Sequence, residues 1–229
     1  MKLLLLFTLL TARVLALEPP FDAHRLQPGR FAYRIMQEGK QIATFTLAVR
    51  AQTDGTYAFT GDAQGFHQHW ESVAQADFTP VSALLAIVHD NGRHYDMAVR
   101  YADGVARGSV AREPNAAIAS EKPLPANTVD QRIDWAAMLS SKLAVGEELA
   151  FHVYDPDTGA TPVQARAEGL KVITVPAGKF EALRLSYRMA KADGPETYEV
   201  QVTPGTPRLL LREEFPDGSV TELVEATPW

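Results

Sequence analysis

The sequence contains no cysteine, which excludes several ways in which exported proteins are cross-linked or anchored. None of the 229 residues can form a disulfide bridge, supply a thiolate to a metal, or carry the lipid of an envelope lipoprotein. The fold must therefore be held together by its own core. A chain of this length is long enough to form such a core without cross-links.

Long apolar runs are also scarce. The longest run, Leu3 to Leu10, follows Lys2 and precedes Val14-Leu15-Ala16, whose composition suits a signal peptidase. Roughly 8 to 10 apolar residues are too few for a spanning helix, which needs about 20. The pattern predicts a secretory signal peptide over residues 1–16, although Arg13 leaves neighbouring cleavage positions open. We expect a soluble mature chain in the periplasm of a Gram-negative envelope, without a transmembrane segment.

Basic residues are outnumbered by acidic ones. Removal of the predicted signal peptide leaves 20 Lys and Arg against 28 Asp and Glu, a net charge of about −8. Such a surface repels nucleic acid and anionic lipid head groups, so neither is expected as a partner. No run of like charge is concentrated in one place, and we expect the charge mainly to keep a monomer in solution.

Tight turns are the clearest structural signal in the chain. Five dipeptides place a residue that tolerates positive φ before a glycine, as hairpin turns require. They are Asp54-Gly55, Asn91-Gly92, Asp103-Gly104, Asp193-Gly194 and Asp217-Gly218. At least five chain reversals follow.

Alternating apolar residues between these turns predict antiparallel strands. In the segment from Arg93 to Tyr101, for example, Tyr95, Met97, Val99 and Tyr101 share one face while the other face is mostly polar. We predict strands over 31–37, 41–51, 56–63, 66–76, 81–89, 93–101, 105–112, 148–154, 162–168, 172–175, 180–191, 197–203, 209–215 and 220–225. So many strands must curl to bury one face, which predicts a mostly β, single domain over residues 17–229, built as a curved antiparallel sheet between a half-barrel and a barrel-like meander.

The middle of the chain interrupts this pattern. Residues 113–128 carry three prolines and no periodicity, and we expect them to form a loop or lid. Beyond them, apolar residues recur at helical spacing, which predicts one amphipathic helix of about 14 residues within 129–145. Thr128 or Asp130 is suited to cap its start, and Gly146 to close its end.

From Thr128 onward, the order of features resembles the bacterial family catalogued as domain of unknown function 3108. The features are Asp130 with Asp134-Trp135 on the short helix, the entry Val175-Pro176-Ala177-Gly178-Lys179-Phe180-Glu181 into a long strand, and the closing stretch from Pro207 to Arg212. The segment Phe31 to Ile35 with Gly39 is similar to the opening hairpin of that family. The resemblance implies an exported envelope protein with a curved antiparallel sheet, and it carries over no activity and no functional residue.

Motifs for catalysis are missing. No serine lies in a Gly-x-Ser-x-Gly elbow, and Ser140 and Lys142 are two residues apart on the predicted helix, so their side chains diverge. Glu213-Glu214 point to opposite faces of a strand, and Asp155 with Asp157 belongs to a predicted turn. We therefore predict no catalytic residue and no cofactor, and we lean toward a protein that is not an enzyme.

Histidines form the one pattern that suggests a metal. His67 and His69 are two residues apart, so on a strand they face the same way and could jointly bind zinc or copper if His89 or His94 lay nearby. A polar strand surface is the more ordinary explanation of such a pair. The metal site, and with it a metal-dependent hydrolase, is the weakest of three functional hypotheses.

The first hypothesis is a non-catalytic periplasmic protein that holds an apolar or amphiphilic ligand in the concave side of its sheet. Its candidate cavity residues are large side chains expected on that side: Phe45, Leu47, Trp70, Tyr95 and Trp135. The second hypothesis is an envelope assembly or scaffold protein with a filled interior, acting through a sheet edge or its outer face on another envelope protein.

Overall fold

The structure is a computed structural model that describes residues 20–191 and 194–229. The predicted signal peptide lies outside the described residues, as does part of the predicted Asp193-Gly194 turn. Within the described ranges, no helix is long and apolar enough to cross a membrane.

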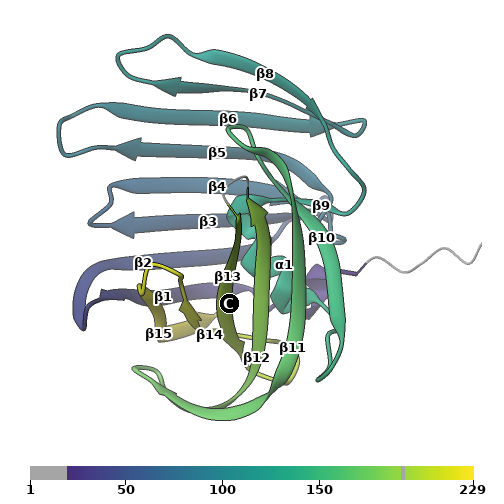
Figure 1. Cartoon of the computed structure of the whole chain (residues 1–229). Helices are drawn as coiled ribbons and strands as arrows, with labels where there is room; N and C mark the ends of the chain where they lie inside the picture. Colours follow the sequence, from purple (N-terminus) through teal and green to yellow (C-terminus); the bar gives the residue numbers. More distant parts are fainter. Residues whose placement is uncertain (1–19, 192–193) are drawn as a thin grey trace, which may run out of the picture.

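In these described ranges, fifteen strands form a single curved sheet, with one α-helix on its concave side (Figure 1). The prediction of a mostly β fold is therefore confirmed. The strands are β1 (Gly29–Gln37), β2 (Lys40–Ala51), β3 (Tyr57–Gln64), β4 (Gln68–Ala74), β5 (Pro80–Val88), β6 (His94–Ala102), β7 (Val105–Arg112), β8 (Ile118–Pro123), β9 (Thr128–Asp130), β10 (Glu148–Asp155), β11 (Gly159–Val175), β12 (Gly178–Lys191), β13 (Gly194–Val202), β14 (Leu210–Glu214) and β15 (Val220–Pro228). The helical elements are η1 (Ala23–Arg25), η2 (Gln131–Ile133) and α1 (Asp134–Ser140).

The strand order places the first and the last strand at the centre of the sheet. The order is β8-β7-β6-β5-β4-β3-β2-β1-β15-β14-β13-β12-β11-β10-β9, so the first strand pairs with the last. All neighbouring strands are antiparallel except β9 and β10, which are parallel. The chain thus winds outward to one edge, β8, crosses to the other edge, β9, through residues 124–127, and returns to the centre. Because so few residues join them, the two edges must come within about 20 Å of each other where they are connected.

The prediction of a loop over residues 113–128 is wrong. Residues 113–128 contain the edge strand β8 and the beginning of β9. Neither strand shows the alternation on which the prediction depended, because β8 is exposed on both faces and β9 is only three residues long and buried throughout. Two strands predicted over 162–168 and 172–175 are likewise one strand, β11, with a bulge between Ala167 and Gly169.

The helix is shorter than predicted, although its buried face is right. Ile133, Ala136, Leu139 and Leu143 are all buried, but α1 has only seven residues and η2 precedes it. The Asp130 side chain caps η2, accepting a hydrogen bond from the Arg132 backbone N–H. α1 itself begins after Ile133 without a side-chain cap and ends at Ser141, so the predicted closure by Gly146 is wrong. The helix ends early because the buried Arg208 guanidinium donates to the carbonyl oxygens of Ser141 and Leu143, at 3.0 and 2.7 Å, which holds that segment extended.

We call β1–β8 and β9–β15 the two arms of the curved sheet, and the main core lies between them. It joins buried side chains of β1–β4 to those of β10–β15, with α1 between them. Trp135 of α1 contacts Phe59 of β3 edge to face, with ring centroids 6.4 Å apart, and Asp134 accepts a hydrogen bond from Tyr187 of β12. The packing is tight: a Cβ on Gly61 would lie 2.2 Å from the Trp70 ring. This interior is filled by the chain's own side chains.

A second, smaller core forms where β9 and β10 meet the concave face of β5–β7. It consists of Ala83, Met97, Val99, Tyr101, Ala106, Val110 and Tyr154. The rings of Tyr101 and Tyr154 meet edge to face at 5.7 Å. We call this contact the seam, because it brings the two ends of the sheet together through side chains, without strand pairing between them.

Candidate functional site

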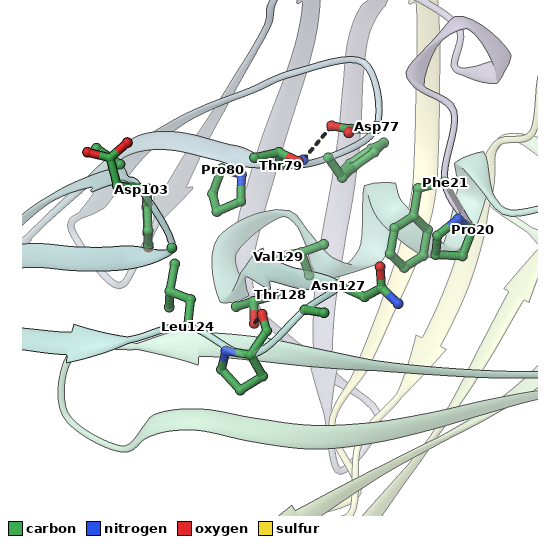
Figure 2. Close-up of a pocket in the computed structure, with 16 residues that line it drawn as sticks. Pro20, Phe21, Asp77, Thr79, Pro80, Asp103, Leu124, Asn127, Thr128 and Val129 are labelled. Atoms are coloured by element: carbon green, nitrogen blue, oxygen red, sulfur yellow. Dashed lines mark hydrogen bonds between the residues drawn. The ribbon is translucent and has the colours of Figure 1, made fainter. Parts of the chain in front are cut away.

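A pocket of about 310 Å³ opens beside the seam, at the rim of the sheet (Figure 2). We call it the rim pocket. Its walls come from four segments that are far apart in the sequence. They are residues 20–21 before η1, the β4–β5 turn at 77–80, the end of β6 and its turn at 101–104, and the 124–129 segment that joins the sheet edges.

The pocket is apolar at its base and polar at its mouth. Phe21, Phe78 and Val129 line it and are almost completely buried, with exposed fractions of 3%, 1% and 1%. At the mouth, the exposed Asp77 and Asp103 come from the two hairpin turns. This combination of an apolar base and a few polar groups is typical of small-molecule sites.

Local backbone bonds hold the two turns in place. The Asp77 carboxylate accepts from the Thr79 backbone N–H at 2.9 Å, which is the dashed line in Figure 2. Asp103 and Gly104 both have positive φ, 53° and 71°, as the predicted hairpin turn requires. Aspartate therefore serves each turn as well as the mouth of the pocket.

The opposite wall is tied to the sheet by its own hydrogen bonds. The Leu124 backbone N–H donates to the Gly104 carbonyl oxygen at 2.8 Å, and the Thr128 hydroxyl donates to the carbonyl oxygen of Pro125 at 2.7 Å. The His152 backbone N–H donates to the carbonyl oxygen of Asn127 at 3.0 Å. The 124–129 segment is thus a fixed strap between the sheet edges.

A polar network lies in the seam beneath the pocket. Tyr101, which lines the pocket, donates its hydroxyl to the buried Asp130 carboxylate. The Arg132 guanidinium makes two bonds to Asp130, each 2.6 Å, and one to Asp155 at 3.2 Å. Burial and then the charge of Asp130 raise the pKa of Tyr101, so its proton stays in place at any ordinary pH. The network contains two carboxylates and one guanidinium.

Two further carboxyl groups face the concave side, away from the rim pocket. Burial, with a contribution from Asp134, raises the pKa of Glu213 to about 8. Burial also raises the pKa of Asp134 to about 6, although hydrogen bonds from the Tyr187 hydroxyl and the Trp135 backbone N–H oppose the shift. Both residues are half-buried. At neutral pH Glu213 is largely protonated.

The predicted cavity residues lie in or against the interior, where they fill space. Leu47 and Trp70 are buried in the main core, and Phe45 packs against Trp70 with ring centroids 6.4 Å apart. Tyr95 lies at the seam, where its hydroxyl donates to Asp157 at 3.0 Å. Trp135 lines an apolar pocket of only about 10 Å³, which is the size of one water molecule.

The histidine pair does not have the geometry on which the metal prediction depended. His67 lies in the β3–β4 turn with a positive φ of 47°, so it is not on the same strand face as His69. The His69 ring is bonded to the carboxylates of Asp62, at 2.7 Å, and Glu71, at 3.3 Å. The bond to Asp62 raises the pKa of His69. Across the described residues, no group of three or more His, Cys, Asp or Glu side chains is placed to hold a metal ion.

The residues of the rim pocket were not predicted as site residues. The sequence did contain two of its signals, the Asp103-Gly104 turn and the proline-bearing 113–128 segment. What it lacked was the strand order, which brings the two turns, residues 20–21 and the edge-joining segment to one place.

Comparison with known proteins places the chain in a family and finds a solved structure with a similar fold. The model of the family described as protein of unknown function (DUF3108) matches residues 21–224, which confirms the resemblance found in the sequence. A search of curated proteins found no match.

Among solved structures, the chain is similar to a beta-barrel-like protein of domain of unknown function DUF1849 from Brucella abortus. The TM-score is 0.66 and the identity 9%, with 90% of this chain and 99% of that chain covered. Structures from Parabacteroides distasonis and Bacteroides fragilis give TM-scores of 0.36 and 0.34, at 14% and 9% identity. They cover 89% and 88% of this chain and 96% and 97% of theirs. The first likeness shows a shared fold.

Proposed function

The chain belongs to the DUF3108 family of proteins of unknown function, and we propose that it is an exported envelope protein that binds a small apolar or amphiphilic molecule in its rim pocket. The observation that carries the proposal is the pocket itself, a cavity of about 310 Å³ built by four separate segments over an apolar, aromatic base. This volume is at the lower end of the range for small-molecule sites, about 300 to 1,000 Å³.

The position of the pocket changes the original ligand hypothesis. That hypothesis placed the ligand deep in the concave side, against Leu47 and Trp70, but those side chains are buried in the main core. Close packing leaves no space there without repacking. A site at the rim needs no such rearrangement, because the pocket already opens to solvent.

Export is supported by the sequence alone. Lys2, the apolar run from Leu3 to Leu10 and the small residues before position 17 have the order of a signal peptide. Sequencing the amino terminus of the protein recovered from a periplasmic fraction tests this part. A mature chain that begins near residue 17 is expected, and an uncleaved chain in the cytoplasmic fraction would contradict it.

The binding proposal is tested by filling the pocket. Leu124 is partly exposed in the pocket wall (Figure 2), so Leu124→Trp adds bulk inside the cavity. We expect this variant to weaken binding of the neutral fluorescent probe N-phenyl-1-naphthylamine at least tenfold, measured by fluorescence titration. Leu170→Trp is the matched control, because Leu170 is 52% exposed on β11 and remote from the pocket. Equal affinity in the two variants would show that the probe does not bind in the rim pocket.

A second candidate function follows from the free edge of the sheet. β8 pairs only with β7, and five of its six residues are exposed, including Ile118 at 66%. Such an edge is able to pair with a strand of another envelope protein. A photoreactive residue at position 118, activated in intact cells, tests this function. A discrete adduct with another protein is expected, and only unmodified protein would contradict it.

A further inference from the structure

We propose that the rim pocket selects an organic cation, meaning an ammonium group attached to an apolar body. This inference rests on the proposed function and adds the charge of the ligand to it. Two features carry it: the sign of the charges around the pocket and the aromatic rings at its base.

The charged residues that line the pocket are all acidic. Its sixteen lining residues include Asp77 and Asp103 and no lysine, arginine or histidine. The two aspartates come from adjacent hairpin turns on the same side of the pocket (Figure 2). Among the described residues that line the pocket, the formal charges are therefore both negative.

Neither carboxylate is neutralised by the protein in the part of the chain that the structure describes. Asp77 accepts only the backbone N–H of Thr79, and Asp103 has neither a hydrogen bond nor an ion pair. Other aspartates of the same sheet do have cationic partners: Asp157 pairs with Arg112, and Asp155 with Arg132. Asp77 and Asp103 are therefore available to a ligand.

The network beneath the pocket does not reverse this preference. Asp130 and Asp155 contribute two negative charges, and Arg132 contributes one positive charge. Tyr101 uses its hydroxyl proton for Asp130, so it presents no donor to an anionic ligand. The net charge of the network beneath the pocket is thus negative, like the charge at the mouth.

The apolar base also suits a cation with an organic body. Phe21, Phe78 and Tyr101 all line the pocket, and the first two rings meet edge to face at 5.8 Å. Aromatic rings bury apolar groups and attract ammonium ions through the negative charge of their faces. An inorganic cation would gain nothing from these rings, whereas an alkyl or arylalkyl ammonium ion would use both features.

Three probes with one apolar body and different head groups test the inference. They are 4-phenylbutan-1-amine, 4-phenylbutan-1-ol and 4-phenylbutanoate, which are positive, neutral and negative at pH 7. We expect the amine to bind most tightly and the acid most weakly, with a difference of roughly threefold to tenfold per step, as partly exposed charge pairs give. Calorimetry of the full chain, without the signal peptide, measures the three affinities.

Two substitutions locate the source of the preference. Asp77→Asn keeps an acceptor for the Thr79 N–H, and Asp103→Asn keeps a residue that tolerates positive φ. Each should weaken amine binding roughly twofold to fivefold and leave alcohol binding unchanged. Asp90→Asn is the control, since it makes the same charge change in the turn at the other end of β6.

The outcomes separate this inference from the proposed function. Equal affinities for all three probes would overturn the cation preference while leaving a binding pocket. An equal loss of amine binding in Asp90→Asn would assign the preference to the net charge of the whole protein and would also overturn it. If none of the three probes bound, and N-phenyl-1-naphthylamine did not bind either, the proposed function would fall.

Discussion

The main core and the seam solve the same problem in different ways, because each joins the two arms of the curved sheet. The main core does so with apolar side chains around α1, and its strands form a continuous hydrogen-bonded ladder in which β1 pairs with β15. The seam has only seven buried residues in its apolar cluster, and the ends of the sheet are not paired there. Ion pairs also hold the seam together, chiefly those of Arg132 with Asp130 and Asp155.

The difference teaches how this sheet is held closed. Apolar packing in the main core is insensitive to charge and depends on shape. A buried ion pair is favourable only while every member is present, because one unpaired charge is strongly destabilising. The seam is therefore the part of the fold that a single substitution should open, and the rim pocket lies beside it.

The largest effect is expected from removing the cation of the seam. Arg132→Met leaves Asp130, which is fully buried, without its cationic partner. We expect a loss of about 3–5 kcal/mol in the free energy of unfolding, measured by urea titration. Arg166→Met is the control: it removes an exposed pair with Glu148 and should change stability by less than about 0.5 kcal/mol. Similar values for the two variants would show that the network does not hold the seam.

A smaller effect is expected from overfilling the main core. Gly61→Ala places a methyl group 2.2 Å from the ring of Trp70, which is 3% exposed and has little freedom to move. We expect a loss of about 1–3 kcal/mol, by the same urea titration. Gly205→Ala meets no atom within 4 Å and should be close to neutral. A neutral Gly61→Ala would mean that the core around Trp70 is loosely packed.

The concave face should give the protein a pH dependence. Because the pKa of Glu213 is raised to about 8, the folded state holds a proton that the unfolded state releases above its ordinary pKa of 4.5. The stability from this group is full below about pH 4.5 and is lost as the pH rises through 8. Glu213→Gln should be more stable than the natural chain at pH 9, by about 1–3 kcal/mol, and should flatten the decline between pH 7 and 9.

Asp134 provides the comparison for that experiment. Because the pKa of Asp134 is about 6, most of its effect on the pH dependence of stability lies below pH 7. The change in stability between pH 7 and 9 therefore reports mainly on Glu213. Thermal unfolding at several pH values measures both curves. Parallel curves for Glu213→Gln and the natural chain would contradict the raised pKa.

The smallest effect is expected at the outer strands. Arg107 of β7 pairs with Glu121 of β8 at 3.1 Å, with side chains 52% and 64% exposed. Arg107→Gln should change the unfolding free energy by less than about 0.5 kcal/mol, because water screens the pair. A loss above about 1 kcal/mol would show that β8 depends on this contact and that the edge is held more firmly than its exposure suggests.

The sequence predicted most strands because their signals are local. Alternation located β7 at its observed bounds, and four Asp-Gly or Asn-Gly turns fall where expected, among them Asp54-Gly55 and Asp217-Gly218. The buried face of the helix was also predictable, since Ile133 and Leu139 follow helical spacing. Its length was not, because the carbonyl groups of Ser141 and Leu143 bond to Arg208, which is more than sixty residues away in the sequence.

The candidate site was not predictable for the same reason. The rim pocket depends on strand order, and no local pattern indicates that β1 pairs with β15 or that Tyr101 meets Asp130. His67 and His69 do not share a strand face as predicted, because His67 lies in the β3–β4 turn and only His69 lies on β4. Local periodicity fixes elements, whereas sites form from contacts between distant segments.

Hydrogen exchange measured by mass spectrometry under native conditions tests the comparison between core and seam most directly. We expect the amides of β8 and β9 to exchange through local opening, at free energies well below those of β1 and β12, which should exchange only on global unfolding. In Arg132→Met the difference should widen, with β9 and β10 losing protection first. Equal protection of β9 and β1 in the natural chain would contradict the account, because it would mean that the seam is as firmly closed as the main core.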